Sequence, residues 1–233
     1  MDFDWPNRYS RGKLSGGISM KKAIICFTRV PRPGKTKTRL MGLLSGEQCA
    51  ELHWAFLNDL NGVYENLDAD LFVFHTPDPD WEMLKNVFPT AKGFYPQSGD
   101  SLGAKMNNAL NAVLALGYDA VVLTGADLPA MGTAHLQNGF DGLRHADVTL
   151  GPTSDGGYYL VGVKAPAPYL FENQTYGSGS VFENARSAVA AAGKSFCSAL
   201  PCDDVDTPTD LRALRLSPDS HTHRYLSMIG VIR

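Results

Sequence analysis

The chain has 233 residues, of which 44% are hydrophobic, and this length suits a single large α/β domain. Its formal net charge of −3 gives no overall basic field, which argues against binding to nucleic acid or to an anionic membrane. No apolar stretch approaches the roughly 18 residues that a membrane span needs, and residues 1–19 lack the apolar core of a signal peptide.

Residues 1–19 precede Met20, which together with Lys21 and Lys22 is typical of a natural start, so we assign them to an N-terminal extension. The four cysteines contain no C-x-x-C pair, and the first of them lies inside an apolar run. We therefore expect reduced cysteines that mostly pack in the interior, and a cytoplasmic location. The cysteines are Cys26, Cys49, Cys197 and Cys202.

Strand and helix patterns alternate from Lys22 onward, with no internal repeat. Runs of aliphatic and β-branched residues predict buried strands, and apolar residues at helical spacing predict amphipathic helices. A capping box at Ser45 and Gln48 predicts the start of the first helix. The predicted strands cover residues 23–28, 71–74, 93–95, 148–150 and 158–163, with two more around 121 and 195. The predicted helices cover residues 45–67, 80–88, 102–116, 181–192 and 208–216, with one more that ends near 144.

These repeated β-α units predict a three-layer α/β/α sandwich with a mostly parallel sheet. The strand at 158–163 follows its neighbour too closely for a helical crossover, so we expect an antiparallel insertion there. We assign residues 20–216 to this one domain and residues 217–233 to a C-terminal tail. His221 and His223 in that tail have no Cys or carboxylate partners in register for zinc, so we interpret the tail as solvated.

The apolar run that ends at Thr124 is followed by Gly125, Asp127 and Pro129. This pattern is typical of a strand buried on both faces, and open α/β sheets bind ligands at the carboxyl ends of their strands. A carboxylate at that place is well positioned to hold a divalent cation. An aspartate after a strand is also the usual N-cap of the next helix, so both interpretations of Asp127 stay open.

Five cations follow the first predicted strand, in a loop that starts at the expected ligand edge of the sheet. In a mildly acidic chain this concentration favours an anionic ligand, such as a di- or triphosphate, over a solvated basic loop. Gly34-Lys35-Thr36 matches the end of a P-loop motif, but Arg29 stands in place of the first glycine of that motif. Two prolines in the loop also remove backbone N–H groups that would bind phosphate. The five cations are Arg29, Arg32, Lys35, Lys37 and Arg39.

Two later segments also carry candidate groups. Asp155-Gly156-Gly157 is either a tight turn before a strand or a bare backbone that a ligand approaches, with Asp155 bonding a hydroxyl. Residues 203–206 contain three carboxylates, and their mutual repulsion needs either exposure or a cation. There is no G-x-S-x-G elbow, and no G-x-G-x-x-G follows the first strand, which disfavours a serine hydrolase and a dinucleotide-binding Rossmann domain.

Together these segments resemble the motifs of a bacterial family of GT-A-like nucleotide-diphospho-sugar transferases, which includes arsenosugar-biosynthesis glycosyltransferases. The resemblance spans residues 21–216. The wider superfamily contains nucleotidyltransferases: Lys37-Thr38-Arg39-Leu40 is similar to a segment of phospholactate guanylyltransferases, and Asp206-Thr207-Pro208 is similar to a metal-binding segment of sugar cytidylyltransferases. The motifs are Pro31-x-Pro33-Gly34-x-x-Lys37-Thr38-Arg39-Leu40, Gly99-x-x-Leu102-Gly103-x-x-Met106, Gly125-x-Asp127-Leu128-Pro129, Asp155-Gly156-Gly157-Tyr158-Tyr159-Leu160 and Asp204-Val205-Asp206-Thr207-Pro208.

The resemblance implies a GT-A-type fold in which Asp127 and Asp206 hold Mg²⁺ or Mn²⁺ and in which Lys37 and Arg39 bind phosphate. Asp127 and Lys37 are thereby candidate catalytic groups, and Asp155 is the nearest candidate general base by its loop position alone. The other residues expected at the nucleotide or at the second substrate are Arg29, Gly34, Leu102, Gly103, Asn107, Gly156 and Gly157.

The chain departs from this family in three places. Arg29 stands where relatives usually carry Lys, and Lys105 stands where they carry Arg. Tyr176-Gly177-Ser178 replaces the usual Trp-Ser-Thr, which leaves the acceptor specificity open.

Three functions are compatible with these features. The first is metal-dependent transfer of a sugar from a nucleotide donor to a small-molecule acceptor, in which the metal neutralises the leaving nucleoside diphosphate. The alternative is nucleotidyl transfer, in which a substrate phosphate or carboxylate attacks a nucleoside triphosphate and releases pyrophosphate. The third is a catalytically inactive protein that binds a nucleotide; the retained Asp127, Asp206 and Lys37-Thr38-Arg39 argue against it.

Overall fold

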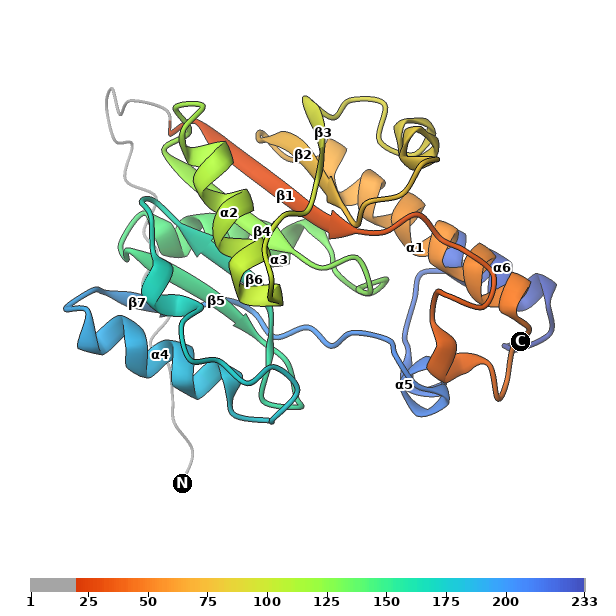
Figure 1. Cartoon of the computed structure of the whole chain (residues 1–233). Helices are drawn as coiled ribbons and strands as arrows, with labels where there is room; N and C mark the ends of the chain where they lie inside the picture. Colours follow the sequence, from red (N-terminus) through yellow and green to blue (C-terminus); the bar gives the residue numbers. More distant parts are fainter. Residues whose placement is uncertain (1–19, 233) are drawn as a thin grey trace, which may run out of the picture.

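The computed structural model describes residues 20–232, which form a seven-stranded sheet with helices on both faces (Figure 1). The strand order is β3-β2-β1-β4-β6-β5-β7. Only β6 pairs antiparallel, with β4 and with β5, so the predicted antiparallel insertion is confirmed. The strands are β1 (Lys22–Thr28), β2 (Asp70–His75), β3 (Gly93–Pro96), β4 (Ala120–Thr124), β5 (Val148–Pro152), β6 (Tyr158–Val163) and β7 (Phe196–Ser198).

Four helices make the two outer layers of the sandwich. Helices α1 (Gly46–Glu65) and α3 (Thr133–Leu143) pack against one face of the sheet. Helices α2 (Leu102–Leu114) and α4 (Val181–Ala191) pack against the other face. The strands are apolar on both faces because each face is covered, which confirms the predicted three-layer architecture.

The shorter helical segments differ more from the predictions. The expected helix at 80–88 is a 3-10 helix, η2 (Trp81–Asn86), and the expected helix at 208–216 ends at α5 (Pro208–Ala213). Leu214 has an extended backbone, with φ −60° and ψ 134°, and this conformation stops the helix. Two further 3-10 turns are η1 (Thr38–Leu40) and η3 (Pro168–Leu170).

The prediction of a solvated C-terminal tail is wrong. Helix α6 (His221–Met228) packs along α1, as Figure 1 shows, and Leu226 is only 1% exposed. Asp59 of α1 fixes its start, because its two carboxylate oxygens accept hydrogen bonds from the N–H groups of His221 and Thr222 at 2.7 and 3.0 Å. These contacts create a small third core, separate from the two cores on the sheet faces.

We call the part of the molecule built on this third core the lobe. It consists of η1, the first half of α1, α5 and α6, and its core residues are Leu40, Leu44, Cys49, Leu52, Phe56, Val205, Leu211 and Leu226.

All four cysteines are free. None of the helices within residues 20–232 combines the length and apolar character that crossing a membrane requires. The predicted N-terminal extension, residues 1–19, lies outside the described residues.

The packing of α6 can be tested by truncating its buried leucine. We expect Leu226→Ala to lower the free energy of unfolding by about 2–5 kcal/mol, the usual cost of removing a buried leucine side chain. Met228→Ala, on the same helix, is the matched control because Met228 is 75% exposed. Equal urea-unfolding midpoints for the two variants would show that α6 is not part of the folded core.

Candidate functional site

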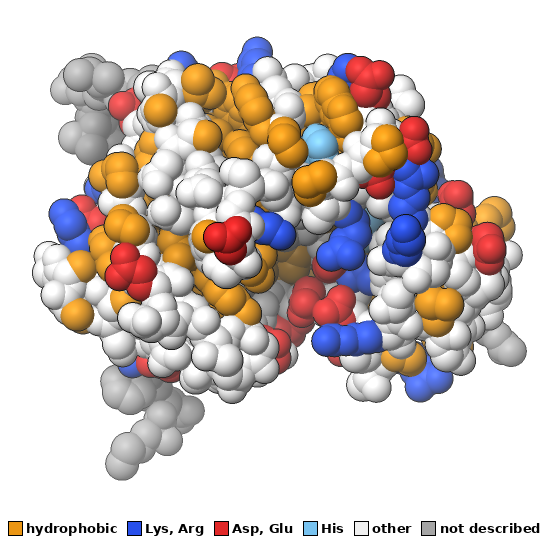
Figure 2. Space-filling model, viewed as in Figure 1, with side chains coloured by type: hydrophobic (Ala, Val, Ile, Leu, Met, Phe, Trp, Pro, Cys, Tyr) orange, Lys and Arg blue, Asp and Glu red, His pale blue; other side chains and the backbone are white. Residues whose placement is uncertain are grey.

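A cavity of about 610 Å³ opens at the carboxyl ends of β1 and β4 and extends to the lobe. Figure 2 shows the hollow between the main body and the lobe, with acidic and basic side chains gathered on its walls. This is the place where open α/β sheets bind ligands, and the volume is that of a small-molecule site. A second pocket of about 200 Å³ shares part of these walls and lies over residues 35–39.

The ammonium of Lys37 joins the two predicted metal ligands. Its Nζ lies 2.6 Å from Asp127 Oδ1 and 3.0 Å from Asp206 Oδ1, and it donates to the carbonyl oxygen of Val205 at 2.6 Å. The contacts with Asp206 and Val205 are hydrogen bonds, and the contact with Asp127 is an ion pair. The side chain of Lys37 is 3% exposed, whereas that of Arg39 is 73% exposed and lines the cavity. Of the two residues predicted to bind phosphate, Arg39 can therefore reach a ligand in the cavity, whereas Lys37 cannot.

The loop before η1 turns Lys37 inward. Lys37 has φ 51°, a left-handed conformation that costs a residue with a Cβ about 1–2 kcal/mol. The preceding turn is closed by N–H groups of Lys35 and Thr36, which donate to the carbonyl of Arg32 at 3.1 Å each. The guanidinium of Arg32 binds both carboxylate oxygens of Asp78, at 2.6 and 3.2 Å, and so points away from the cavity. The contacts of Lys37 are what hold this strained backbone in place.

His53, on the buried side of α1, lies behind Asp127. Its Nδ1 is 3.2 Å from Asp127 Oδ1, and the residue is 3% exposed. His53 and Lys37 thus enclose Oδ1, while the Asp127 side chain as a whole is 41% exposed, so its second oxygen faces the cavity. Our sequence analysis missed His53. The feature of the sequence that could have identified His53 is its position on the apolar stripe of α1, four residues from both Cys49 and Leu57.

Two aspartates of the cavity have opposite pKa shifts. Burial raises the pKa of Asp127, but the hydrogen bond from His53 and the charge of Lys37 outweigh it, and the net pKa lies well below its usual range. Burial and the nearby charge of Asp206 raise the pKa of Asp204 to about 6. Asp127 therefore stays ionised at neutral pH, while Asp204 lies in a more negative and less hydrated environment.

The Asp155 loop lies at the opposite end of the cavity from Lys37. Asp155 Oδ1 accepts hydrogen bonds from Thr153 Oγ1 and from the N–H of Gly157, and these bonds lower the pKa of Asp155. The turn itself requires glycine at position 156, which has φ +85° and would bring a Cβ to 2.0 Å from the carbonyl oxygen of Gly179. A carboxylate with a lowered pKa is a weak base, so the predicted role of Asp155 as general base gains no support from its electrostatics.

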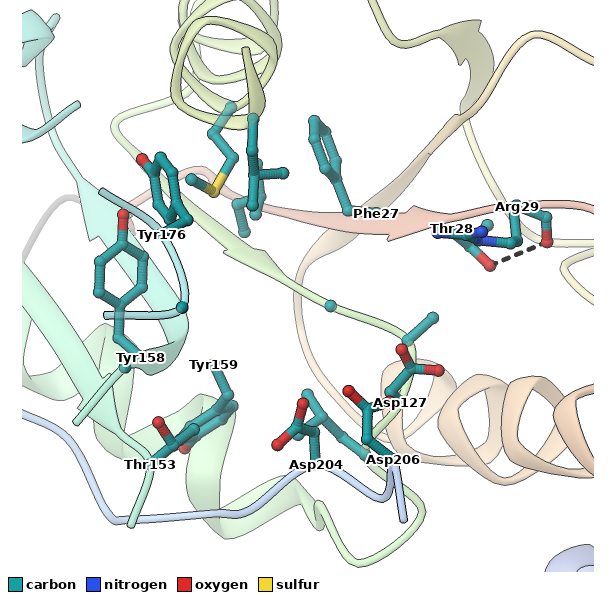
Figure 3. Close-up of a pocket in the computed structure, with 18 of the residues that line it drawn as sticks. Phe27, Thr28, Arg29, Asp127, Thr153, Tyr158, Tyr159, Tyr176, Asp204 and Asp206 are labelled. Atoms are coloured by element: carbon teal, nitrogen blue, oxygen red, sulfur yellow. Dashed lines mark hydrogen bonds between the residues drawn. The ribbon is translucent and has the colours of Figure 1, made fainter. Parts of the chain in front are cut away.

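Aromatic and apolar side chains cover the remaining walls. Figure 3 shows Tyr158, Tyr159 and Tyr176 on the side of the cavity away from Arg29. The buried hydroxyls of Tyr158 and Tyr176 interact with each other, whereas the hydroxyl of Tyr159 donates to the carbonyl of Leu200 at 2.9 Å. Leu102 and Met106 of α2 complete the wall.

The carboxylate pair offers hard oxygen ligands of the kind that Mg²⁺ and Mn²⁺ prefer. Within residues 20–232, no group of three or more His, Cys, Asp or Glu side chains has the geometry of a metal site. The Oδ1 atoms of Asp127 and Asp206 face Lys37, so the outer oxygens are the two Oδ2 atoms, and that of Asp206 lies 3.4 Å from Arg39. This donor set fits a cation that takes one or two protein carboxylates and completes its coordination with substrate phosphate, as Mg²⁺ commonly does.

Seven of the twelve predicted site residues line the cavity, and five do not. Gly103 packs under Tyr176, where a Cβ would lie 2.8 Å from the tyrosine hydroxyl, and Asn107 accepts a hydrogen bond from Asn111 at 3.3 Å. Gly34 and Gly156 shape turns, with φ of +71° and +85°. The predicted residues that do line the cavity are Arg29, Arg39, Leu102, Asp127, Asp155, Gly157 and Asp206, while Lys37 lines the smaller pocket.

Comparisons with known proteins identify relatives over most of the chain. Residues 60–178 match the family described as "Uncharacterized protein conserved in bacteria (DUF2064)". A crystal structure from Desulfovibrio desulfuricans G20, described as a "putative nucleotide-diphospho-sugar transferase", is 32% identical with a TM-score of 0.83, and the match covers 89% of this chain and 94% of that one. The 2-phospho-L-lactate guanylyltransferase of Methanothermobacter thermautotrophicus is 27% identical over 84% of this chain and 86% of its own length.

A more distant structure supports the assignment of the fold but not of a function. The crystal structure of a 4-diphosphocytidyl-2C-methyl-D-erythritol synthase is 12% identical with a TM-score of 0.57, and the match covers 84% of this chain and 97% of that chain. The fold is therefore that of the nucleotide-diphospho-sugar transferases, and the related proteins are transferases.

The role of the Lys37 ammonium can be tested by removing its charge. We expect Lys37→Met to lower the free energy of unfolding by about 1–3 kcal/mol, because Asp127 Oδ1 is then left buried without its cation. Lys35→Met, in the same loop but exposed, is the control and should unfold like the wild type. Chemical denaturation in the presence of a chelator measures both, and equal stability of the two variants would contradict the assigned role.

The raised pKa of Asp204 gives a pH-dependent prediction. The pKa of the Asp204 carboxyl is about 6 in the folded protein and near 3.9 in the unfolded chain. Relative to high pH, protonation of this carboxyl therefore stabilises the folded state. This stabilisation is complete below about pH 3.9 and is lost as the pH rises through about 6. Asp204→Asn stays neutral, so metal-free variant and wild type should have similar melting temperatures near pH 4. Near pH 8 the variant should melt at the higher temperature. A difference that is independent of pH would refute this environment for Asp204.

Proposed function

The chain belongs to the family described as "Uncharacterized protein conserved in bacteria (DUF2064)", and we propose that it transfers a sugar from a nucleoside-diphosphate donor to a small hydroxyl acceptor, with the help of Mg²⁺ or Mn²⁺. The division of the cavity into two ends supports this proposal. One end carries Arg29, Arg39, Asp127 and Asp206, and the other carries tyrosines and the Asp155 loop. A donor with two phosphates and an acceptor with hydroxyls match these two ends in charge.

The number of available cations favours a diphosphate over a triphosphate. Of the five cations in the loop after β1, Arg32 is bound to Asp78 and Lys37 is buried between carboxylates. Arg29 and Arg39 are the two that line the cavity. Guanidinium groups bind phosphate oxygens in a bidentate manner, and two of them suit the charge of a diphosphate that also shares a divalent cation.

Gln97, just after β3, supports a nucleobase at the Arg29 end of the cavity. Its Nε2 donates to the carbonyl oxygens of Thr28 and Phe74 at 3.1 Å each, which fixes the orientation of the amide. The remaining oxygen, Oε1, can then accept a hydrogen bond from an N–H group of a base. Phe27 and Met106 line the same cavity and supply apolar surface for the ring.

The residues of the charged end would act on the leaving group. A divalent cation bound there would supply Lewis-acid stabilisation of the departing nucleoside diphosphate. Lys37 holds the carboxylates of Asp127 and Asp206 in fixed positions before any substrate arrives, so little reorganisation is needed during the reaction. Arg39, which is 3.4 Å from Asp206 Oδ2, is placed to bind a phosphate oxygen beside them.

Nucleotidyl transfer is the second candidate function. The sequence relationship to a 2-phospho-L-lactate guanylyltransferase favours it. In this reaction the same arginines and carboxylates would bind a nucleoside triphosphate, and the acceptor would attack its α-phosphorus and release pyrophosphate.

The two functions differ in their products. We expect at least one nucleotide sugar to raise the melting temperature in the presence of Mn²⁺, since ligands that bind the native state stabilise it. We also expect that sugar nucleotide to be hydrolysed slowly to a nucleoside diphosphate, with water in place of the acceptor. Pyrophosphate release from a triphosphate, with no nucleotide sugar bound or cleaved, would support nucleotidyl transfer instead.

A variant of Arg39 tests whether the nucleotide binds at this end of the cavity. Arg39→Ala should weaken nucleotide binding by roughly 1.5–3 kcal/mol, the scale of a hydrogen bond to a charged group. Arg186→Ala is the matched control, because Arg186 lies on the exposed side of α4 and pairs only with Glu183 at 2.6 Å among the described residues. Calorimetric titration should separate the two variants; equal affinities would remove Arg39 from the site.

A further inference from the structure

Two carboxylates of the cavity have no ion pair with any cation in residues 20–232. They are Asp155, in the loop between β5 and β6, and Asp204, in the segment that leads to α5. The other two carboxylates of the cavity, Asp127 and Asp206, are both bound to Lys37. Unpaired negative charge therefore extends from Asp204, which lies beside Asp206, to the Asp155 loop at the end of the cavity that would receive the acceptor.

The two segments are held together. The N–H of Ser154 donates to Asp203 Oδ1 at 2.6 Å, and the N–H of Cys202 donates to the carbonyl oxygen of Pro152 at 3.2 Å. Figure 3 shows Asp204 between Thr153 and Asp206, on the floor of the cavity. These hydrogen bonds fix the backbone of the two segments side by side, and those from Thr153 and Gly157 also hold the carboxylate of Asp155.

Among residues 20–232, the arginine side chains that line the cavity come from the opposite end, and no lysine lines it. Arg29 and Arg39 follow β1, and within residues 153–177 and 204 the cavity is lined by no lysine or arginine. The nearest ammonium of the site, Lys37, is buried and already bound to carboxylates. A phosphate or carboxylate on the acceptor would face Asp155 and Asp204 with no lysine or arginine from residues 153–177 to compensate it, which is an unfavourable arrangement in a partly buried cavity.

The uncharged groups at this end suit a polyol. Tyr158 and Tyr176 line the cavity with their rings, and their hydroxyls interact with each other; burial and this interaction raise the pKa of Tyr158. The ring of Tyr159 is fixed by its own hydroxyl bond to Leu200 and offers an aromatic face. Rings and carboxylates of this kind can bind a sugar, and they also attract an ammonium group.

From these observations we infer that the acceptor is an uncharged or amine-bearing polyol, and not a phosphorylated or carboxylated compound. The inference rests on the proposed function and specifies its second substrate. In the transfer, the acceptor oxygen forms a bond to the anomeric carbon of the donor sugar. The bond from that carbon to the diphosphate oxygen breaks, its electron pair leaves with the nucleoside diphosphate, and the hydroxyl proton is released to solvent.

Pairs of probes that differ only in a phosphate test the inference. The full chain is loaded with Mn²⁺ and with the nucleoside diphosphate that raises its melting temperature most. Ribose, glucose, glucosamine and glycerol are then titrated, each beside its phosphate ester, and apparent affinities are taken from the thermal shift. We expect at least one uncharged or amine-bearing member to bind at least tenfold more tightly than its phosphate ester.

Charge-neutralising variants show whether the two aspartates cause this preference. Asp155→Asn retains an oxygen for the bonds from Thr153 and Gly157, and together with Asp204→Asn it should reduce the preference to threefold or less. Glu65→Gln, on the exposed end of α1, is the control and should keep the full preference. An equal response to both members of every pair, including no response at all, or tighter binding of the phosphate esters, would overturn the inference.

The same experiment separates this inference from the proposed function. Binding of a nucleoside diphosphate together with preferred binding of phosphate esters would overturn only the acceptor class. If no nucleotide stabilises the protein with Mn²⁺, the proposed function fails and the inference fails with it.

Discussion

The ammonium of Lys37 connects three segments that are far apart in the sequence: the loop after β1, the end of β4 and the segment before α5. It also helps to fix the lobe to the edge of the sheet, together with α1 and the hydrogen bond from the N–H of Val205 to the carbonyl oxygen of Asp127 at 2.9 Å. Two carboxylates this close would repel each other without a cation between them. The protein supplies that cation itself, so the shape of the site exists before any ligand binds.

The sequence was sufficient to predict the layers and the antiparallel insertion, because buried strands and amphipathic helices have different periods along the chain. It was not sufficient for α6. Only Leu226 of that helix is a fully buried apolar residue, and the helix is held by Asp59, more than 150 positions earlier. Such a helix has little signal of its own, since its stability comes from the groove that it fills and not from its local pattern.

The sequence predicted which segments meet at the cavity better than it predicted the direction of individual side chains. Asp127 and Asp206 come together because both lie at the carboxyl edge of the sheet. Lys37 could not be distinguished from its exposed neighbours in the loop, because the left-handed backbone that turns it inward leaves no mark in the residue types. On α2, Leu102 and Met106 are one turn apart and line the cavity, whereas Asn107 is rotated away.

The reversed direction of β6 has a consequence for how this protein can diversify. A parallel strand would need a long crossover after β5, but β6 returns directly, so a tight hairpin places Asp155 at the ligand edge. Hairpin tips accept insertions and substitutions more readily than strands or crossovers do. Related chains can therefore change this tip, and with it the compound that receives the transferred group, while the segments after β1 and β4 remain constant. Comparing the length and charge of this hairpin among relatives would sort the family by what its members modify.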